Sequence, residues 1–566
     1  MKNSNYPLYK VDHISNLKEL IENASLKYSN KTAFEYRIKG NNTKKVTYNQ
    51  LKEHINSLGT AFYSMGLKDS HIAVIGENSY EWIVTYFATV NGSNVIVPID
   101  KDLSAQEIKN NLIDSNCRAI VYSHKYSKMI KEIEDQLPEI KYFIDMNGEE
   151  DNNKFLSYES LIEKGNQLIS QGDDSFIKNE IDANKLAAII YTSGTTGVSK
   201  GVMLSHENLA ANTVGTLRHA KVHEVSVLIL PIHHTFGFTA GVLCMIHGGN
   251  KVCINKSLKS VSKDIKNFKP TDLILVPLFL EKMYKKIWDT ANKNGKANLL
   301  RKTIKTSNFL LKLGIDIRRK LFKNVLDGFG GDLELIVCGG APLDSKYVQG
   351  FRDFGITVLN GYGITECSPI VSGFRNNYFR DGTIGQVLPC CEVKIDKFPD
   401  SDEGEILVKG KTVMLGYYKN EEATIDAMND GWFRTGDLGK IDKDGFLYIT
   451  GRKKNLIVLR NGKNIYPEEL EMFISNIPYV EEVVVYCEGD IDIDTNIIAE
   501  VYLDNEYIIA NEIKDARKEL EKDIDDINKT IPHYKNIKEI RIRETEFEKT
   551  TTKKIKRFAI KAMSGA

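Results

Sequence analysis

Short apolar segments alternate with helix-like segments in the first part of the chain. Residues 72–75 and 94–97 are predicted to be strands, and residues 81–90 between them have the apolar spacing of a helix. The same alternation resumes at residues 119–122 and 142–144. Strand, helix and strand in this order favour a parallel sheet covered on both faces by helices. We therefore expect an α/β fold.

The length of 566 residues is too great for one ordinary core and indicates roughly three to four folding units. Residues 383–418 change to short alternating segments, which predict a small antiparallel β subdomain. From residue 453 helix and strand patterns alternate again. We predict a large domain over residues 1–452, with parallel α/β sheets and the β subdomain, and a small α+β domain over residues 453–566.

A glycine-rich and hydroxyl-rich loop at residues 191–201 follows an apolar run at residues 186–190. Its three glycines turn backbone N–H groups inward, five threonines and serines add hydroxyls, and Lys200 adds a positive charge, so the loop is suited to a polyphosphate. It is not a Walker A loop, because Lys200 lies between Ser199 and Gly201. An ordinary surface loop is the alternative. The candidate ligands are Thr192, Ser193, Gly194, Thr195, Thr196 and Gly197.

Two further glycine segments follow predicted strands. Residues 338–343 follow the strand at 333–337, and residues 360–366 follow the strand at 357–359. Ligands of α/β sheets bind at the carboxyl ends of strands. A carboxylate such as Glu366 beside a phosphate loop suits Mg²⁺, although alone it is better explained as an exposed acid in a turn. The candidate ligands of the nucleotide are Gly340, Ala341, Pro342, Asn360, Gly361 and Tyr362, the last offering a flat ring to adenine.

The loop and these segments resemble, in order and approximate spacing, those of the adenylate-forming superfamily. This superfamily holds the acyl-CoA ligases, the luciferases and the adenylation domains of nonribosomal peptide synthesis. The resemblance covers nearly the whole chain, and residues 281–328 are most similar to the long-chain fatty acyl-CoA synthetases. It implies that ATP, Mg²⁺ and coenzyme A take part. It also implies catalytic roles for Lys200, Thr365 and Glu366, the last also as the metal ligand.

The segment at residues 432–439 places Asp437 in a glycine turn, where it could accept both ribose hydroxyls. A structural aspartate that caps the turn is the alternative. Residues 451–455 resemble the hinge of the superfamily, which implies that Arg452 reaches the nucleotide, that Lys454 is the pivot and that the small domain is mobile.

The basic segment at residues 549–557 resembles the lysine motif of the superfamily, with Lys554 in the catalytic position. Glu548 and Lys553 occupy the positions where that motif has a proline and a glycine. This difference makes the identity of the active lysine less secure, and on charge alone a basic tail is the more common explanation.

Two adjacent histidines, His233 and His234, lie where the superfamily has a gate beside the carboxylate substrate. His234 matches best, and we expect His234, Phe236 and Gly237 to line the pocket entrance. A hydrogen-bonded core histidine is the alternative. No acid occurs between residues 231 and 247, so an ammonium group would have no partner from this segment. This absence favours a plain carboxylic acid as the substrate.

Residues 293–325 contain ten lysines and arginines against one acid, Asp316. A solvated helix face is the simpler explanation of such a run. The alternative is a basic patch that makes peripheral contact with an anionic membrane surface or binds a phosphate-bearing cosubstrate.

The overall composition excludes several classes of protein. Lysine plus arginine and aspartate plus glutamate number 76 each, so no global field favours nucleic acid. No apolar run approaches the ~20 residues of a transmembrane helix, and the N-terminal residues lack the apolar core of a signal peptide. The eight cysteines lack metal-ligand spacing. We expect reduced thiols and a cytoplasmic protein.

We therefore predict a fatty acyl-CoA ligase of the AMP-forming type, which activates a fatty acid as an acyl-adenylate and transfers it to the thiol of coenzyme A. Two alternatives remain open. The acceptor could be the thiol of a carrier protein, or the chain could be a non-catalytic binder of fatty acid or nucleotide.

Overall fold

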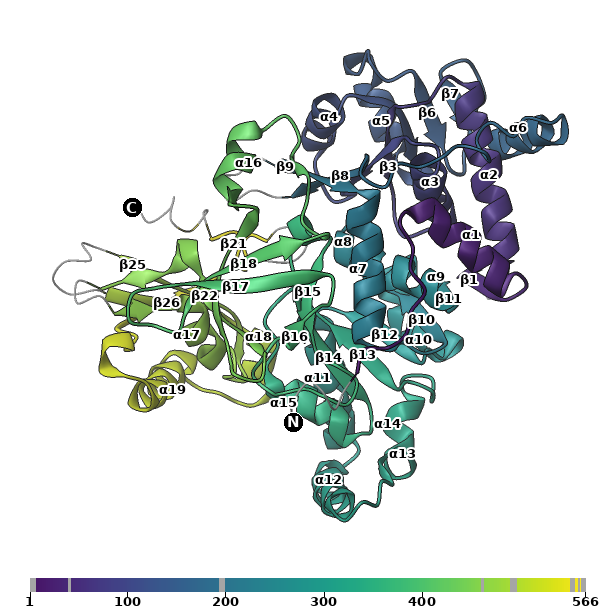
Figure 1. Ribbon diagram of the computed structural model, residues 1–566. Helices are drawn as coiled ribbons and strands as arrows, with labels where there is room; N and C mark the ends of the chain where they lie inside the picture. Colours follow the sequence, from purple (N-terminus) through teal and green to yellow (C-terminus); the bar gives the residue numbers. More distant parts are fainter. Residues whose placement is uncertain are drawn as a thin grey trace.

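Two large mixed sheets and a smaller C-terminal unit make up the protein (Figure 1). The structure is a computed structural model, and it describes residues 7–38, 42–192, 199–459, 463–488, 496–549, 555–557 and 560. In its described part, no helix has both the length and the apolar character needed to cross a membrane. All eight cysteines are free thiols, and five of them are buried.

The first sheet has eight strands in the order β19-β9-β8-β4-β3-β5-β6-β7. Its strands from β8 to β7 are parallel, which confirms the expected α/β alternation. The strand β9 is antiparallel to β8, and β19 is antiparallel to β9. The bounds are β3 (His71–Ile75), β4 (Val95–Ile99), β5 (Cys117–Tyr122), β6 (Tyr142–Asp145), β7 (Phe155–Ser157), β8 (Leu186–Thr192), β9 (Lys200–Ser205) and β19 (Gly416–Tyr417).

The second sheet has nine strands in the order β16-β15-β14-β13-β12-β10-β11-β1-β2. It is parallel from β14 to β1 and antiparallel at both ends. The bounds are β1 (Thr32–Arg37), β2 (Thr43–Thr47), β10 (Val225–Leu228), β11 (Lys251–Ile254), β12 (Asp272–Leu275), β13 (Leu335–Cys338), β14 (Thr357–Gly363), β15 (Ile370–Gly373) and β16 (Gln386–Val387).

The helix α7 (His206–His219) begins directly after β9. The side chain of Ser205 accepts a hydrogen bond from the Asn208 N–H, and the Asn208 side chain accepts one in return from the Ser205 N–H, so that two free donors of the first turn are satisfied. One hydrophobic core contains residues of α7 and of both large sheets. The other helices of this region are α1 (Leu17–Tyr28), α2 (Tyr48–Ser64), α3 (Tyr80–Val90), α4 (Ala105–Asp114), α5 (Ser127–Ile133), α6 (Tyr158–Ser170), α8 (Thr235–Phe238), α9 (Cys244–Gly248) and α10 (Val261–Phe268).

The strand β14 corrects one sequence prediction. It was expected to end at Leu359 and to give way to a glycine turn, but it continues to Gly363 and pairs antiparallel with β15. At Gly363 an added Cβ would lie 2.2 Å from the carbonyl oxygen of Pro369. Glycine therefore serves close strand pairing here, and this backbone approach was not visible in the sequence pattern.

The predicted antiparallel β subdomain is present. Its strands are β17 (Cys391–Lys397), β18 (Gly404–Gly410), β20 (Met428–Asn429), β21 (Trp432–Ile441) and β22 (Leu447–Arg452), and all their pairings are antiparallel. The short helix α16 (Glu421–Ala427) lies between β19 and β20. The last strand, β22, ends at Arg452.

The residues after Arg452 build a three-stranded sheet with its own core, distinct from those of the large sheets. Few polar contacts between this unit and the rest are described. Lys285 pairs with Asp504 at 3.2 Å, and the Tyr466 hydroxyl donates to Glu403 at 2.8 Å. The bounds are β23 (Ile457–Val458), β24 (Asn464–Ile465), α17 (Pro467–Ile474), β25 (Val480–Glu488), β26 (Asn496–Leu503), α18 (Asn505–Ala510), α19 (Ala516–Thr530) and β27 (Glu539–Arg543).

Candidate active site

The base of the predicted phosphate loop is formed by the end of β8 and the start of β9. The Thr192 hydroxyl donates a hydrogen bond to the carbonyl of Lys200 at 3.4 Å, across the two strands. The predicted ligands Ser193, Gly194, Thr195, Thr196 and Gly197 lie outside the described residues. Strand β9 is held on its other side by β19, and the Tyr418 N–H donates to the Gly201 carbonyl at 2.7 Å. The position of Lys200 is thus fixed by strands on both sides.

Tyr417 connects two predicted catalytic residues. The Lys200 Nζ atom lies 4.9 Å from the centre of the Tyr417 ring, which is within the range of a cation–π contact. The Tyr417 hydroxyl donates a hydrogen bond to Glu366 Oε1 at 2.9 Å. Sequence reasoning missed Tyr417, whose only signal was a Gly-Tyr-Tyr triplet after an apolar segment. The glycine of that triplet, Gly416, has a φ of +141°.

The Glu366 carboxylate is buried beside Thr365 in a short 3₁₀ turn, and the Met414 N–H donates to the Glu366 carbonyl at 2.8 Å. Burial raises the pKa of Glu366, whereas the Tyr417 hydroxyl acts to lower it. A divalent cation would offset the cost of this buried negative charge. Mg²⁺ prefers carboxylate oxygens, so the donor atoms and the electrostatics of Glu366 fit a magnesium ligand.

Asp437 is paired on both of its carboxylate oxygens. The Tyr362 hydroxyl donates to Oδ2 at 2.6 Å, and Arg452 Nε lies 3.0 Å from Oδ1. The register of β21 and β22 sets Asp437 directly opposite Arg452. The Asp437 side chain is 4% exposed and the Arg452 side chain 45% exposed. Each carboxylate oxygen keeps a second lone pair, so ribose hydroxyls can still donate to Asp437.

A cavity of about 850 Å³ opens beside these residues, within the ~300–1,000 Å³ typical of ligand pockets. Arg434 and Lys453 on its wall pair with Glu405. Five basic and three acidic side chains line the wall, so the cavity presents net positive charge, and Lys200 and Lys454 make no ion pair with any described carboxylate. Its wall consists of Lys200, Glu405, Tyr417, Asn420, Glu422, Ala423, Asp426, Ala427, Arg434, Thr435, Gly436, Arg452, Lys453 and Lys454.

Burial lowers the pKa of Lys454, and the charges of Arg452 and Arg557 lower it further. The predicted catalytic Lys554 lies outside the described residues. Arg557, three positions later, donates to the Val485 carbonyl at 3.2 Å and pairs with Glu471. Arg557 is therefore anchored to the C-terminal unit. Its positive charge is close enough to Lys454 to lower the pKa of that lysine.

The two adjacent histidines meet an acid from another part of the chain. The Nε2 atoms of His233 and His234 lie 3.1 Å apart, and His233 Nε2 lies 3.3 Å from Asp100 Oδ1. Asp100 follows directly after β4. Residues 231–247 themselves contain no acid, as noted in the sequence, but the end of a separate strand brings Asp100 beside them. That carboxylate pairs with His233, and the preference for a plain carboxylic acid stays a prediction.

The predicted pocket residue Phe236 lies against the end of β13. A Cβ added to Gly339 would lie 3.3 Å from Phe236 Cζ and 3.3 Å from the Gly361 carbonyl oxygen. The next residue, Gly340, has a φ of +88°, which favours glycine, and it begins the exposed Gly340–Ala341–Pro342 loop. Phe236 and the backbone at Gly361 thus both lie close to the position that a side chain at Gly339 would occupy.

Two further predicted residues have structural contacts. Asn360 is buried, and its amide donates to the Thr383 carbonyl at 3.3 Å. At Gly237 an added Cβ would lie 2.3 Å from the carbonyl oxygen of Pro231, so this glycine permits the tight turn that carries the histidines.

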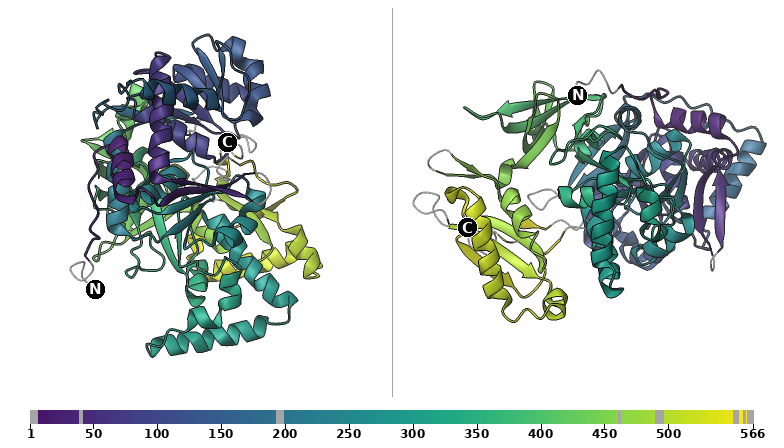
Figure 2. Two further views of the ribbon diagram at one scale, coloured as in Figure 1. Left: turned by 90° about the vertical axis from the view of Figure 1, so that its right-hand side faces the viewer. Right: turned by 90° about the horizontal axis from the view of Figure 1, so that it is seen from below.

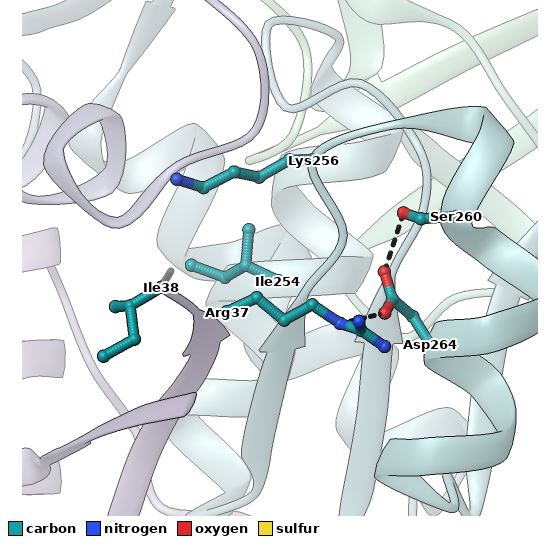
Figure 3. A pocket seen from close by; sticks show the side chains of 6 residues that line it. All are labelled: Arg37, Ile38, Ile254, Lys256, Ser260 and Asp264. Carbon is teal, nitrogen blue, oxygen red and sulfur yellow. Dashed lines mark hydrogen bonds and ion pairs between the residues drawn. The ribbon is translucent and has the colours of Figure 1, made fainter. Parts of the chain in front are cut away.

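A smaller cavity of about 420 Å³ lies away from the predicted residues, between the ends of β1 and β11 and the helix α10 (Figure 3). Asp264 on its wall accepts hydrogen bonds from Asn255 at 2.6 Å and Ser260 at 2.8 Å and pairs with Arg37 at 2.5 Å. Protein groups therefore contact both carboxylate oxygens, and we attribute these contacts to fold stability.

Residues 21–418 match the family model described as AMP-binding enzyme. The chain belongs to this family. Residues 454–563 match a second model, AMP-binding enzyme C-terminal domain. These matches confirm the family resemblance drawn from the motifs, and the AMP-binding enzymes share the combination of a large α/β part and a C-terminal domain that the structure shows.

Curated relatives match most of this AMP-binding enzyme. Long-chain-fatty-acid–CoA ligase FadD15 of Mycobacterium bovis is 28% identical over 548 residues, covering 90% of this chain and 90% of the relative. Long-chain-fatty-acid–CoA ligase 5 of Rattus norvegicus is 28% identical over 524 residues, covering 86% and 76%. The crystal structure of the anthranilate CoA ligase AuaEII in complex with anthranoyl-AMP superposes with a TM-score of 0.78 at 21% identity, covering 100% and 99%. This last likeness shows the fold.

Proposed function

We propose that the protein is a long-chain fatty acid–CoA ligase of the AMP-forming type. A carboxylate oxygen of the fatty acid attacks the α-phosphorus of ATP, and the bond to the leaving pyrophosphate breaks, which gives an acyl-adenylate. The sulfur of coenzyme A then attacks the acyl carbonyl carbon, and AMP leaves. Family membership supports the chemistry, and the names of the curated relatives support the long-chain acid and the acceptor.

The observation that carries this proposal is the arrangement around the larger cavity. Lys200 and Lys454 bring unpaired positive charge to its wall, while Glu366 and Asp437 are buried beside it and held by tyrosine hydroxyls. Positive charge is needed where phosphate oxygens gather charge during displacement. An ordinary surface loop, or an isolated aspartate that caps a turn, would not require positive charge on the cavity wall together with buried carboxylates held by tyrosine hydroxyls.

Each residue has a separate proposed role. Asp437 orients the ribose hydroxyls, and Arg452 and Lys200 bind phosphate oxygens. Glu366, with Thr365 beside it, would hold Mg²⁺. When bound, Mg²⁺ would neutralise charge on the leaving pyrophosphate. Lys554 is proposed to act on the α-phosphate, and Lys454 to serve as the pivot of the C-terminal unit. His234 and Phe236 are proposed to line the entrance for the acid.

The test is pyrophosphate release by the full chain with a panel of acids: saturated fatty acids of increasing length, an aromatic acid and an amino acid. We expect release to be fastest with a long-chain acid. A faster reaction with the amino acid, or no release with any acid, would contradict the proposal. Asp437→Asn should reduce release strongly, whereas Asp426→Asn on the same cavity wall should not.

The acceptor is tested in the same assay with coenzyme A and a phosphopantetheinylated carrier protein offered separately. We expect acyl transfer to coenzyme A. Exclusive transfer to the carrier would establish the alternative ligase, and binding of ATP and fatty acid without pyrophosphate release would establish a non-catalytic binder.

We propose a cytoplasmic location for the protein, and the free state of all eight cysteines favours it.

A further inference from the structure

Four helices form a projection at one end of the molecule, which we call the basic projection (residues 277–327). In Figure 1 it extends from the lower edge of the large sheets, and the left view of Figure 2 shows α12 lying across its tip. Its helices are α11 (Pro277–Lys293), α12 (Ala297–Lys312), α13 (Arg318–Leu321) and α14 (Lys323–Asp327). It contains the run of ten basic residues noted in the sequence.

The structure divides these ten residues into two groups. Arg318 pairs with Asp316 at 2.7 Å, Arg319 donates to the Leu333 carbonyl at 2.7 Å, and Lys323 pairs with Asp327 at 2.8 Å. These three therefore have structural partners. The remaining basic side chains are exposed and form no ion pair with a described carboxylate: Lys293, Lys296, Arg301, Lys302, Lys305, Lys312 and Lys320. The concentration of positive charge at the tip is thus not neutralised by the fold.

Large apolar side chains share this surface. Leu299, Phe309 and Leu313 are each 62% exposed, and Ile315 is 50% exposed. Single exposed apolar residues are ordinary, but a group of them among unpaired cations marks an interaction surface. A helix face that only contacts solvent would explain the charged side chains. It would not explain the exposed large apolar side chains. The structure therefore weakens the simpler explanation of the basic run.

The spacing on α12 places the two kinds of side chain on one face. Leu299, Lys302, Thr306 and Phe309 follow one another at intervals of three, four and three residues, which brings them onto the same side of a helix. The opposite side, with Ala297 and Ser307, is buried against the rest of the protein. An outward face on which exposed apolar residues lie beside a lysine is typical of helices that lie in the headgroup layer of a membrane.

We propose that the basic projection binds the surface of a bilayer that contains anionic phospholipids. Helix α12 lies parallel to the membrane, Leu299, Phe309 and Leu313 enter the acyl boundary, and the unpaired lysines contact lipid phosphates. Charge complementarity selects an anionic lipid surface over a neutral one. At its other end the projection follows directly after Val276, whose Cγ1 lies 3.6 Å from the position of a Cβ on Gly340, so a membrane-bound projection is joined to the predicted nucleotide loop.

The experiment is co-sedimentation of the full chain with vesicles of phosphatidylcholine alone and with vesicles that also contain phosphatidylglycerol. We expect binding to the anionic vesicles only, decreasing as salt is raised. The variant Lys302→Gln/Lys305→Gln/Lys312→Gln should lose on the order of a hundredfold in partition coefficient. The matched control is Lys514→Gln/Lys518→Gln/Lys522→Gln, which removes three exposed lysines from the C-terminal unit and should bind as the parent does.

The apolar contribution has its own pair of variants. Leu299→Ser/Phe309→Ser should reduce binding to anionic vesicles, whereas Leu26→Ser/Ile509→Ser, at two other strongly exposed apolar positions, should not. Equal binding to both kinds of vesicle, or unchanged binding by the Lys302→Gln/Lys305→Gln/Lys312→Gln variant, would overturn the proposal.

The same apolar face could instead pair two copies of the chain. Sedimentation velocity without lipid would then show a dimer that Leu299→Ser/Phe309→Ser dissociates, and such a dimer together with absent vesicle binding would also overturn the proposal. Vesicle binding does not require turnover, so it can succeed or fail independently of the proposed reaction. Pyrophosphate release from a short, water-soluble acid should be unchanged in every one of these variants.

Discussion

Charged side chains have different surroundings in two regions of the molecule, the larger cavity and the basic projection. In the cavity region the carboxylates of Glu366 and Asp437 are buried, and each accepts a hydrogen bond from a tyrosine hydroxyl. At the tip of the projection, lysines such as Lys302 and Lys305 are exposed and have no described carboxylate partner. Buried charges interact strongly over short distances, whereas exposed charges act over longer distances and are screened by salt. Salt dependence and variant effects should therefore differ between the two regions.

The largest effect is expected at Lys554. Lys554→Ala should lower adenylation by ~10²–10³, since one donor to a developing charge typically contributes that much, and should largely spare thioester formation. The reason is the proposed role: Lys554 follows Lys454 in the sequence, and if the C-terminal unit turns about Lys454 as proposed, Lys554 would reach the α-phosphate in only one orientation of that unit. The two measurements are pyrophosphate exchange with fatty acid, and conversion of supplied acyl-adenylate and coenzyme A to acyl-CoA.

Equal losses in both half-reactions of this variant would show a structural role for Lys554. The control is Lys553→Ala. If that neighbour abolishes exchange while Lys554→Ala does not, the catalytic position in the altered motif is shifted by one residue.

A second strong effect is expected at the buried carboxylate. Glu366→Gln keeps an acceptor for the Tyr417 hydroxyl but removes the negative charge, so it should lower adenylation by about 10² and weaken fatty acid binding much less. The loss should change little with salt. The measurement is the adenylation rate as a function of Mg²⁺ concentration. Glu422→Gln, on the exposed wall of the same cavity, is the matched control, and an unchanged rate for Glu366→Gln at limiting Mg²⁺ would exclude the metal-side role.

Much of the fold was predictable because local patterns and the final structure agree. The strands β3, β4, β5 and β6 were predicted from apolar segments, and β8 contains the apolar run at residues 186–190. The extension of β14 was missed, since its cause is a partner strand whose backbone approaches Gly363. Periodicity reports the environment of a segment and does not report which distant backbone will pair with it.

The candidate site shows the same limit. Motif residues such as Glu366 and Asp437 could be named from the sequence, but their tyrosine partners could not be paired with them. Tyr417 lies 51 positions from Glu366, and Tyr362 lies 75 positions from Asp437. Asp100 was missed beside His233 for the same reason, because the end of a separate strand brings it there. Which side chains become partners across long sequence distances depends on the topology of the fold, and a local sequence pattern does not show it.

A smaller effect, on stability, is expected from a buried histidine. His219 Nε2 donates to the Gly373 carbonyl at 2.8 Å, and burial lowers the pKa of His219 to about 4. The unfolded chain, with a pKa near 6.5, therefore binds more protons than the folded protein between pH ~6.5 and ~4. Stability present above this window is lost as the pH falls through it, by about 2 kcal/mol between pH 7 and pH 5.

The variant that tests this loss is His219→Gln, which keeps an N–H donor and cannot titrate. Urea midpoints measured at pH 7 and pH 5 should differ less in the variant than in the parent. An identical pH dependence of the two proteins would show that His219 does not contribute.

The smallest effect is expected at an exposed ion pair between the two units. The charge of Lys556 helps to lower the pKa of Glu107 in the large domain, and we propose that the described orientation of the two units is the one used for adenylation. Lys285 and Asp504 pair across the same boundary. Exposed pairs contribute less than about 1 kcal/mol, so Lys285→Gln should lower adenylation relative to thioester formation by less than about fivefold. Rates of both half-reactions at low and high salt provide the measurement, and a difference that persists at high salt would contradict this assignment.

The pairing of β9 with β19 has a consequence for the order in which the protein can assemble. Strand β9 needs residues 416–417 on its outer side, although these are synthesised more than 200 positions after it. Contacts so distant in sequence form late, because closing a long chain segment costs entropy. A nascent chain that ends before residue 416 leaves β9 as an open sheet edge, which invites pairing with other chains. During translation, aggregation should therefore be most probable until β19 emerges from the ribosome.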